Sequence, residues 1–162
     1  MTAAEDGYTW FFRSEFAVVV RTVYLILRDQ GRAQDISQDA FMQLFLHWSK
    51  VSRYERPEAW VRRVAIRMAI RERKRDRLRA FLERKTTEDT TPAVIGLDLE
   101  DAMAGLPVMQ RAVVVLYYFE DRPSNEIAEI LGLSQSTVRV HLSRARRRLA
   151  QILREEVNED VD

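Results

Sequence analysis

Cysteine is absent from this chain, and glycine and proline are scarce, at 5 and 4 of 162 residues. Without cysteine the protein has no disulfide framework, thiolate metal site or thiol nucleophile. The scarcity of helix breakers leaves most of the chain free to be helical, and a hydrophobic content of 46% is enough to bury a core. The composition therefore predicts an all-α fold of small helical domains.

The chain also lacks long apolar runs and any catalytic signature. No run approaches the ~20 residues that cross a bilayer, and the N-terminus carries acids where a secretion signal is basic. The only histidines, His47 and His141, fall outside metal-binding spacings, and phosphate loops and nucleophile elbows are missing. We therefore expect a cytoplasmic protein without membrane insertion that is not an enzyme, with no catalytic residue, no metal and no cofactor.

A strong overall charge is missing as well, because the formal net charge is only +1. The charges are nevertheless segregated along the chain. Arg and Lys far outnumber Asp and Glu over 53–79, and residues 135–154 contain no acid at all, whereas residues 155–162 contain acids and no base. Since counterion release depends on where charge lies rather than on its sum, the two basic stretches indicate a polyanionic partner.

Apolar spacing predicts helices over 8–28, 33–48, 57–82, 97–104 and 107–119. Trp10 and Phe45 are expected in the core with the other apolar residues of the first two helices, and Gly31 is expected to end the first helix. The Thr-rich, acidic stretch 84–96 has no such spacing and is predicted to be a flexible linker. The resulting domains are 1–83, with three helices, and 97–162.

Residues 123–148 carry the pattern of a helix-turn-helix. Ile127 and Leu131 follow helical spacing, Gly132 permits a tight turn, and Ser134 can cap the next helix. A helical hairpin that only packs is the alternative, but its exposed face would usually mix charges of both signs, which the second helix does not. The pattern therefore favours a helix that reads a DNA groove.

Two further basic features precede the linker. The helix over 57–82 carries a stripe of like charges with spacings of four, four and three, formed by Arg63, Arg67, Arg71 and Lys74. The loop 49–57 before it places an aromatic between bases, as Arg53, Tyr54 and Arg56, a composition suited to single-stranded DNA. A solvated helix end is the alternative for the stripe, and packing on the domain is the alternative for Tyr54.

An acidic motif, DISQDAF at 35–41, opens the second predicted helix. Acids near a helix N-terminus favour its dipole, which explains Asp35 and Asp39 in part. The helix dipole does not explain Gln38, which is expected on the same exposed side. A protein-binding patch is the other interpretation.

Three blocks in this order resemble one family. Tyr24-Leu25, Asp29 and DISQDAF resemble the core of its region 2, RPEAWVRRVAIRMA at 56–69 resembles its P-x-A-W motif, and SNEIAEILGLSQSTVRVHLSRARRRL at 124–149 resembles its region 4. The chain thus resembles the extracytoplasmic-function sigma factors, group 4 of the sigma-70 superfamily, of the actinobacterial SigE-like type. Three positions depart from the family pattern: Arg67 replaces an Asn, Ser136 a Gly and His141 an Arg.

The resemblance implies a protein that binds core RNA polymerase and directs promoter-specific transcription initiation. Its partners would be the β′ clamp helices, the β flap and promoter DNA, and an anti-sigma factor is left open. Contact with core polymerase would fall on Asp35, Gln38 and Asp39. Region 2 would melt the downstream element through the loop 49–57 and the stripe that follows it. Region 4 would read the upstream element through Gln135, Ser136, Arg139, Val140, His141, Ser143 and Arg144. A stand-alone helix-turn-helix regulator is the alternative, although it would leave DISQDAF and the basic stripe unexplained.

Overall fold

The N-terminal lobe of the computed structural model consists of helices alone. Residues 2–83 and 98–159 are described by this structure, and within those ranges no strand occurs. The predicted linker 84–96 lies outside the described residues. The helices of the N-terminal lobe are α1 (Ala3–Leu27), α2 (Gln30–Leu46), α3 (Trp48–Val51) and α4 (Pro57–Leu82).

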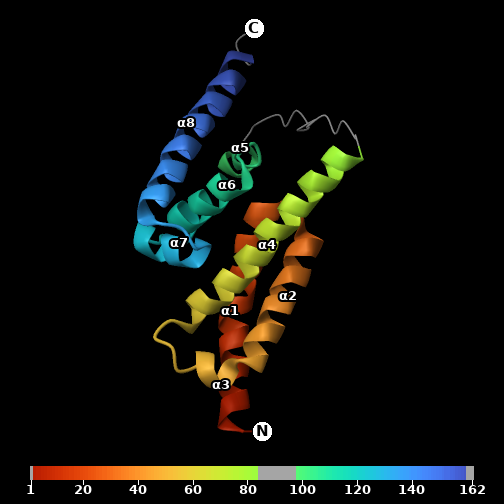
Figure 1. Ribbon diagram of the computed structural model, residues 1–162, viewed down its shortest axis with the longest axis vertical. Coiled ribbons are helices and arrows are strands. Elements are labelled where there is room, and N and C mark those ends of the chain that lie inside the picture. The colour runs from red at the N-terminus through yellow and green to blue at the C-terminus, as the bar shows by residue number, and fades with distance from the viewer. Residues whose placement is uncertain (1, 84–97, 160–162) are drawn as a thin grey trace.

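The C-terminal lobe contains the predicted helix-turn-helix and two preceding helices. Its elements are α5 (Leu99–Met103), α6 (Val108–Val114), a π-helical turn η1 (Val115–Phe119), α7 (Ser124–Leu131) and α8 (Gln135–Glu159). The helix predicted over 107–119 is therefore confirmed, but its last five residues wind as a π-helix. In Figure 1 this lobe lies beside α1 and α4, while α2 lies on their other side.

Two aromatic residues expected in the core lie outside it. The N-terminal core closes around Phe41, which packs edge-on against Phe12 and Phe16. Trp10 is 72% exposed and Phe45 is 50% exposed, so their predicted burial is wrong. Both residues follow the apolar spacing of their helices and are nevertheless exposed. Phe45 packs one side of its ring against Tyr8 of α1, with 5.1 Å between the ring centres, and leaves half of its surface open to solvent.

The boundary between α1 and α2 also differs from the prediction. Arg28, with φ 58°, ends α1 in the left-handed conformation, and its N–H bonds to the carbonyl of Tyr24. Asp29 then caps α2 by accepting a hydrogen bond from the N–H of Arg32 at 3.1 Å. Gly31 lies in the first turn of α2 instead of ending α1. Because Asp29 caps a helix that begins at Gln30, Gly31 falls inside that helix and cannot act as the end of α1.

The turn of the helix-turn-helix is built as the sequence predicts. Gly132 ends α7 with φ 68°, a conformation that glycine adopts without steric cost. Ser134 accepts a hydrogen bond from the N–H of Thr137 at 3.1 Å and so caps α8. Local chemistry therefore determines where α7 ends and α8 begins.

A buried polar cluster joins the two lobes. Glu120, at the end of η1, accepts hydrogen bonds from Arg62 at 2.8 Å, Thr22 at 2.9 Å and Arg122 at 2.9 Å. Arg62 also pairs with Glu15 at 3.0 Å. The side chains of Glu120 and Arg62 are each only 8% exposed. We call these five residues the interlobe cluster; since they come from α1, α4 and the C-terminal lobe, the cluster fixes the lobes against each other.

Arg111 of α6 makes a second connection between the lobes. Its guanidinium is buried and donates to main-chain carbonyls at the ends of α1 and α5 and in the turn after α5, those of Ile26, Met103, Ala104 and Leu106. Burial, followed by the charges of Arg73 and Arg28, lowers the pKa of Arg111 to about 10, so it stays charged at neutral pH. It therefore adds a charged donor to carbonyls at two helix ends, where the helical hydrogen-bond pattern stops.

Gly132 also touches the other lobe, which leads to a stability prediction. A Cβ at Gly132 would lie 2.8 Å from Nη2 of Arg67 on α4. We expect Gly132→Ala to lower the free energy of unfolding by about 1–2 kcal/mol, partly from left-handed strain and partly from displaced Arg67. When Arg67 is already replaced by Ala, the destabilisation caused by Gly132→Ala should come from the left-handed strain alone. Urea unfolding of the four proteins of this double-mutant cycle measures the difference, and strictly additive values would contradict the contact.

Candidate nucleic-acid interface

The predicted basic stripe lies on one face of α4, as its spacing indicates. Arg63, Arg71 and Lys74 are exposed, whereas Arg67 is half-buried against the turn at Gly132. Burial and then the charges of Arg63 and Arg71 lower the pKa of Arg67, because the three guanidinium groups are neighbours on this face. Exposed Arg63, Arg71 and Lys74 beside half-buried Arg67 form a positively charged surface that favours a polyanion.

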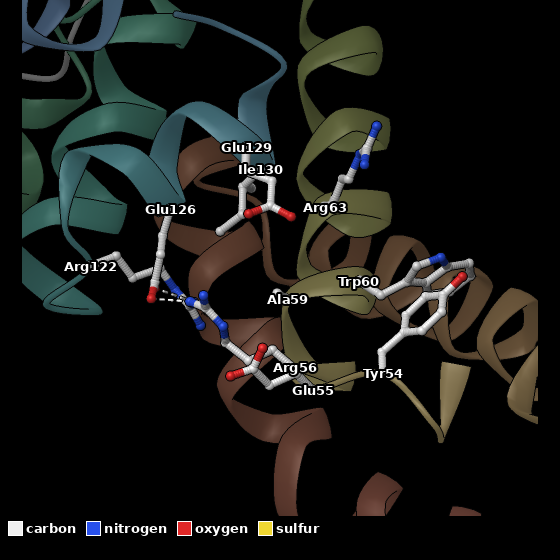
Figure 2. A pocket seen from close by; sticks show the side chains of 10 residues that line it. All are labelled: Tyr54, Glu55, Arg56, Ala59, Trp60, Arg63, Arg122, Glu126, Glu129 and Ile130. Atoms are coloured by element: carbon white, nitrogen blue, oxygen red, sulfur yellow. Dashed lines mark hydrogen bonds and ion pairs between the residues drawn. The ribbon is translucent and has the colours of Figure 1, made fainter. Parts of the chain in front are cut away.

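The segment before α4 is more ordered than the predicted loop. Its first part winds as the short helix α3, and the turn 52–56 then leads into Pro57. Arg53 and Arg56 are exposed, and Tyr54 is 41% exposed, so part of its ring is accessible while the rest packs on the lobe. Figure 2 shows the ring of Tyr54 beside that of Trp60 at the mouth of a cavity of about 340 Å³.

This cavity lies between the two lobes. Arg56 and Arg63 line it from the N-terminal lobe, and Glu126, Glu129 and Arg122 from the C-terminal lobe. Arg56 reaches across and forms an ion pair with Glu126, as Figure 2 shows. Together, the turn 52–56 and the α4 stripe form what we call the cationic face, made of Arg53, Tyr54, Arg56, Arg63, Arg67, Arg71 and Lys74.

A second candidate surface lies on the first turns of α8. Six of its seven predicted residues are exposed, and His141 is half-buried. Burial and then the charge of Arg144 lower the pKa of His141, so the imidazole is neutral at physiological pH. We call this the α8 face, composed of Gln135, Ser136, Arg139, Val140, His141, Ser143 and Arg144.

Arg146, the next arginine along α8, turns away from the α8 face. Its Nε donates to the hydroxyl of Tyr118 at 2.6 Å, and its guanidinium lies 5.5 Å from the ring centre of Tyr117. Arg146 thereby ties α8 to η1, and nothing in the sequence distinguishes it from the neighbouring arginines.

The acidic motif is exposed on α2, away from both basic surfaces. Asp35, Gln38 and Asp39 are exposed, and within the described residues none of them makes a side-chain hydrogen bond or ion pair. Because α2 begins at Gln30, the first turn contains no acid, and the helix dipole does not account for this motif. The motif is therefore free to contact another molecule.

Beyond the acidic motif, the exposed side of α2 continues into apolar residues. The sequence patterns did not mark these residues as part of a binding surface. Met42 and Leu46 are 62% and 71% exposed, and Phe45 lies beside them. At spacings of three and four they follow directly on Gln38 and Asp39. The sequence does contain a signal for them, because the second predicted helix has more apolar residues than one buried face can hold. We call the α2 stripe the set Asp35, Gln38, Asp39, Met42, Phe45 and Leu46.

The described residues contain neither a metal-ligand cluster nor a membrane-spanning helix. No group of His, Cys, Asp or Glu there has the arrangement of a metal site. No helix in the described ranges is both long and apolar enough to cross a membrane.

Two families match the chain, one on each lobe. Sigma-70 region 2 matches residues 11–79, and Sigma-70, region 4 matches residues 96–149. The matches cover the cationic face and the α2 stripe in the first case and the α8 face in the second. The fold and its candidate surfaces thus define a protein of the sigma-70 type.

Curated relatives define the family more narrowly. SigL of Mycobacterium tuberculosis H37Rv, an ECF RNA polymerase sigma factor, is 30% identical over 149 residues, which cover 86% of this chain and 84% of SigL. The ECF RNA polymerase sigma factor SigE of Mycolicibacterium smegmatis is 32% identical, over 93% of this chain and 63% of SigE. The chain belongs to the ECF RNA polymerase sigma factors. It spans 34% of another relative, the sigma factor RfaY of Xanthomonas campestris.

Solved structures support the fold. The sigma factor RpoE of Bartonella quintana, in complex with the anti-sigma factor NepR, is 21% identical and has a TM-score of 0.71, over 91% of this chain and 97% of RpoE. CnrH, in complex with the cytosolic domain of CnrY, is 19% identical with a TM-score of 0.67, over 94% and 90%. At these identities the likeness concerns the arrangement of helices.

Proposed function

We propose that this protein is a cytoplasmic sigma factor that binds core RNA polymerase and directs promoter-specific transcription initiation. The observation that carries the proposal is the presence of three separate exposed surfaces on one small chain. The α2 stripe is acidic and apolar, whereas the cationic face and the α8 face are basic. A protein that connects core RNA polymerase to two DNA segments needs one surface for each of these three partners. The protein acts by binding and catalyses no reaction itself.

Each surface has a proposed partner. The α2 stripe contacts the β′ clamp helices, with Met42 and Leu46 extending the contact that Asp35, Gln38 and Asp39 begin. The cationic face holds the melted downstream element, since Tyr54 offers a stacking surface beside arginines. The α8 face enters the major groove of the upstream element, and its lobe contacts the β flap.

A stand-alone helix-turn-helix regulator is less well supported. It would use the α8 face, but it would leave the α2 stripe and the region 2 match without a role. An anti-sigma factor remains a further proposed partner, because RpoE and CnrH were each solved with a protein partner bound.

The proposal is tested by reconstitution with core polymerase. We expect the protein to co-purify with core enzyme and to confer initiation from a defined set of promoters, mapped by sequencing transcript starts. A regulator would bind its operator without polymerase and would confer no initiation on core enzyme. Absence of promoter-specific initiation with active core enzyme would overturn the proposed function.

The α2 stripe provides a prediction for the same assay. We expect the double variant Gln38→Ala with Asp39→Ala to bind core polymerase roughly five- to tenfold more weakly, because two exposed polar contacts are lost without any change to the core. Circular dichroism should show an unchanged fold. The matched control is Gln151→Ala with Glu155→Ala, an exposed pair on α8. Equal binding by the parent and the α2 variant would contradict the assignment of this stripe.

A further inference from the structure

One valine of the α8 face lies on the side of its helix that is opposite to the packed side. The apolar residues of α8 around it are buried, since Val138 is 0% exposed and Leu142 is 6% exposed. Val140 is two positions from each of them and is 46% exposed. Two positions correspond to about half a helical turn, so its side chain is directed away from the core of the lobe. Packing of α8 therefore does not account for an apolar residue at this position.

The preference of the helix backbone does not account for Val140 either. A β-branched side chain loses rotamer freedom in a helix, so valine is a poorer helix former than alanine or the long polar residues. The same restriction holds the two methyl groups of valine in one dominant orientation. A group that is already fixed loses little conformational entropy when it meets a partner. Val140 is thus unfavourable for an isolated helix but well suited to a defined apolar contact.

Val140 is the only apolar member of the α8 face. Ser136, Ser143 and Arg144 lie four, three and four positions from it, so they share its side of the helix. All four side chains are exposed. The hydroxyl groups and the guanidinium form hydrogen bonds, whereas the valine offers only methyl groups. The face therefore combines polar contacts with a single apolar one.

The major groove of DNA offers a matching apolar group. Thymine carries its C5-methyl there, beside the hydrogen-bond donors and acceptors that the four bases present. Contact between this methyl and an apolar side chain removes the surface of both from water. A polar side chain at the same position would gain nothing from the methyl. An exposed valine on a helix that enters the major groove therefore favours thymine.

We propose that Val140 reads the methyl group of a thymine in the upstream element and so determines the specificity of the α8 face at that position. The inference rests on the proposed function, because it places α8 in the major groove. It adds the identity of one base and the atom through which that base is recognised. Uracil pairs as thymine does and lacks only the methyl, so the proposal predicts that uracil is not accepted equally at this position.

The test replaces thymine by uracil in duplex DNA. The full chain, without polymerase, selects duplexes from a random library, and each thymine of the selected sequence is then replaced in turn. Fluorescence anisotropy measures the dissociation constant of each duplex. We expect the parent to bind about three- to fivefold more weakly when the thymine read by Val140 is replaced, as for the loss of one buried methyl group. Replacement of thymines outside the contact should leave the affinity unchanged.

The variant Val140→Ala removes the protein side of the same contact. We expect it to bind the thymine duplex about three- to tenfold more weakly and to bind the thymine and uracil duplexes equally, because the two changes remove one interaction. Stability to urea should not fall, since alanine is the better helix former. The matched control is Leu153→Ala, at an exposed apolar position of α8 outside the α8 face. It should keep the parent's preference for thymine.

Three results would overturn the proposal. The parent could bind the thymine and uracil duplexes equally at every position, the preference for thymine could persist in Val140→Ala, or the selection could enrich no thymine. None of these results concerns initiation with core enzyme, on which the proposed function depends. A chain that reads thymine through Val140 but confers no initiation would support this inference and overturn the proposed function.

Discussion

Replacing Glu120 with Ala should lower the free energy of unfolding by about 3 kcal/mol, because it leaves a buried guanidinium without its main partner. Arg62 would keep only the ion pair with Glu15, at 3.0 Å. Thr22 and Arg122 would each lose a hydrogen bond as well. Urea unfolding followed by circular dichroism measures the change, and Glu155→Ala on exposed α8 is the control.

The size of this effect distinguishes a buried pair from a surface one. An exposed ion pair contributes about 0–1 kcal/mol, so a loss in that range for Glu120→Ala would mean that water reaches the cluster. A further variant, Arg62→Met, removes the cation instead. Placed together with Glu120→Leu, it should be less destabilising than either change alone, since neither Arg62 nor Glu120 then remains buried without its partner.

The same carboxylate gives stability a defined pH dependence. Burial raises the pKa of Glu120, but the charges of Arg62 and Arg122 and their hydrogen bonds outweigh burial, so the folded pKa lies below its usual value of 4.5. A lowered folded pKa means that the stabilisation is complete above the unfolded pKa and is lost as pH falls through the folded one. Unfolding of the parent below about pH 4.5 should therefore show a loss that Glu120→Gln lacks.

The parts of the fold that the sequence predicted well are those set by local chemistry. Gly132 and Ser134 determine the turn and cap of the helix-turn-helix within a few residues, so reading them in order was sufficient. Pro57 likewise marks the start of α4. The helices themselves were predicted by apolar spacing. The predictions for Gly31, Trp10 and Phe45 were wrong, and neither the short helix α3 nor the π-helical turn η1 was anticipated.

The contacts between the lobes could not be predicted in this way. Glu120 and Arg62 are 58 positions apart, and nothing in either neighbourhood marks them as partners. Arg111 resembles any surface arginine in sequence, although it is buried under the carbonyls of two helix ends. Arg67 was expected to face DNA or, as part of a solvated helix end, to face solvent, yet it lies against Gly132 of the other lobe. Such pairs depend on tertiary geometry that one sequence does not encode locally.

The candidate binding surfaces could be predicted from the sequence in part. The charge pattern placed the α4 stripe on one face correctly, and the structure shows the α8 face exposed as expected. The apolar end of the α2 stripe was missed because Phe45 fits the helical period of the core. The exposure of Phe45 distinguishes a core residue from a residue of the exposed stripe, since a core residue would not be half accessible.

The final prediction concerns the α8 face. Arg139→Ala and Arg144→Ala should each weaken promoter recognition by about 1–3 kcal/mol, roughly five- to 150-fold in binding, if the arginine reads a guanine edge. An arginine that holds a phosphate should instead weaken binding to all sequences equally and reduce the salt slope by about one. Because both side chains are exposed on α8, neither change should affect folding.

The measurement is holoenzyme binding to a panel of promoters with single changes in the upstream element, across a series of salt concentrations. A variant of a base-reading arginine loses discrimination at one position of the panel, whereas a variant of a phosphate-binding one loses none. Arg154→Ala, on the same helix beyond the α8 face, is the matched control and should behave as the parent. If both variants keep the parent's selectivity at every upstream position, α8 does not read the base edges through these arginines, and upstream recognition depends on backbone contacts or DNA shape.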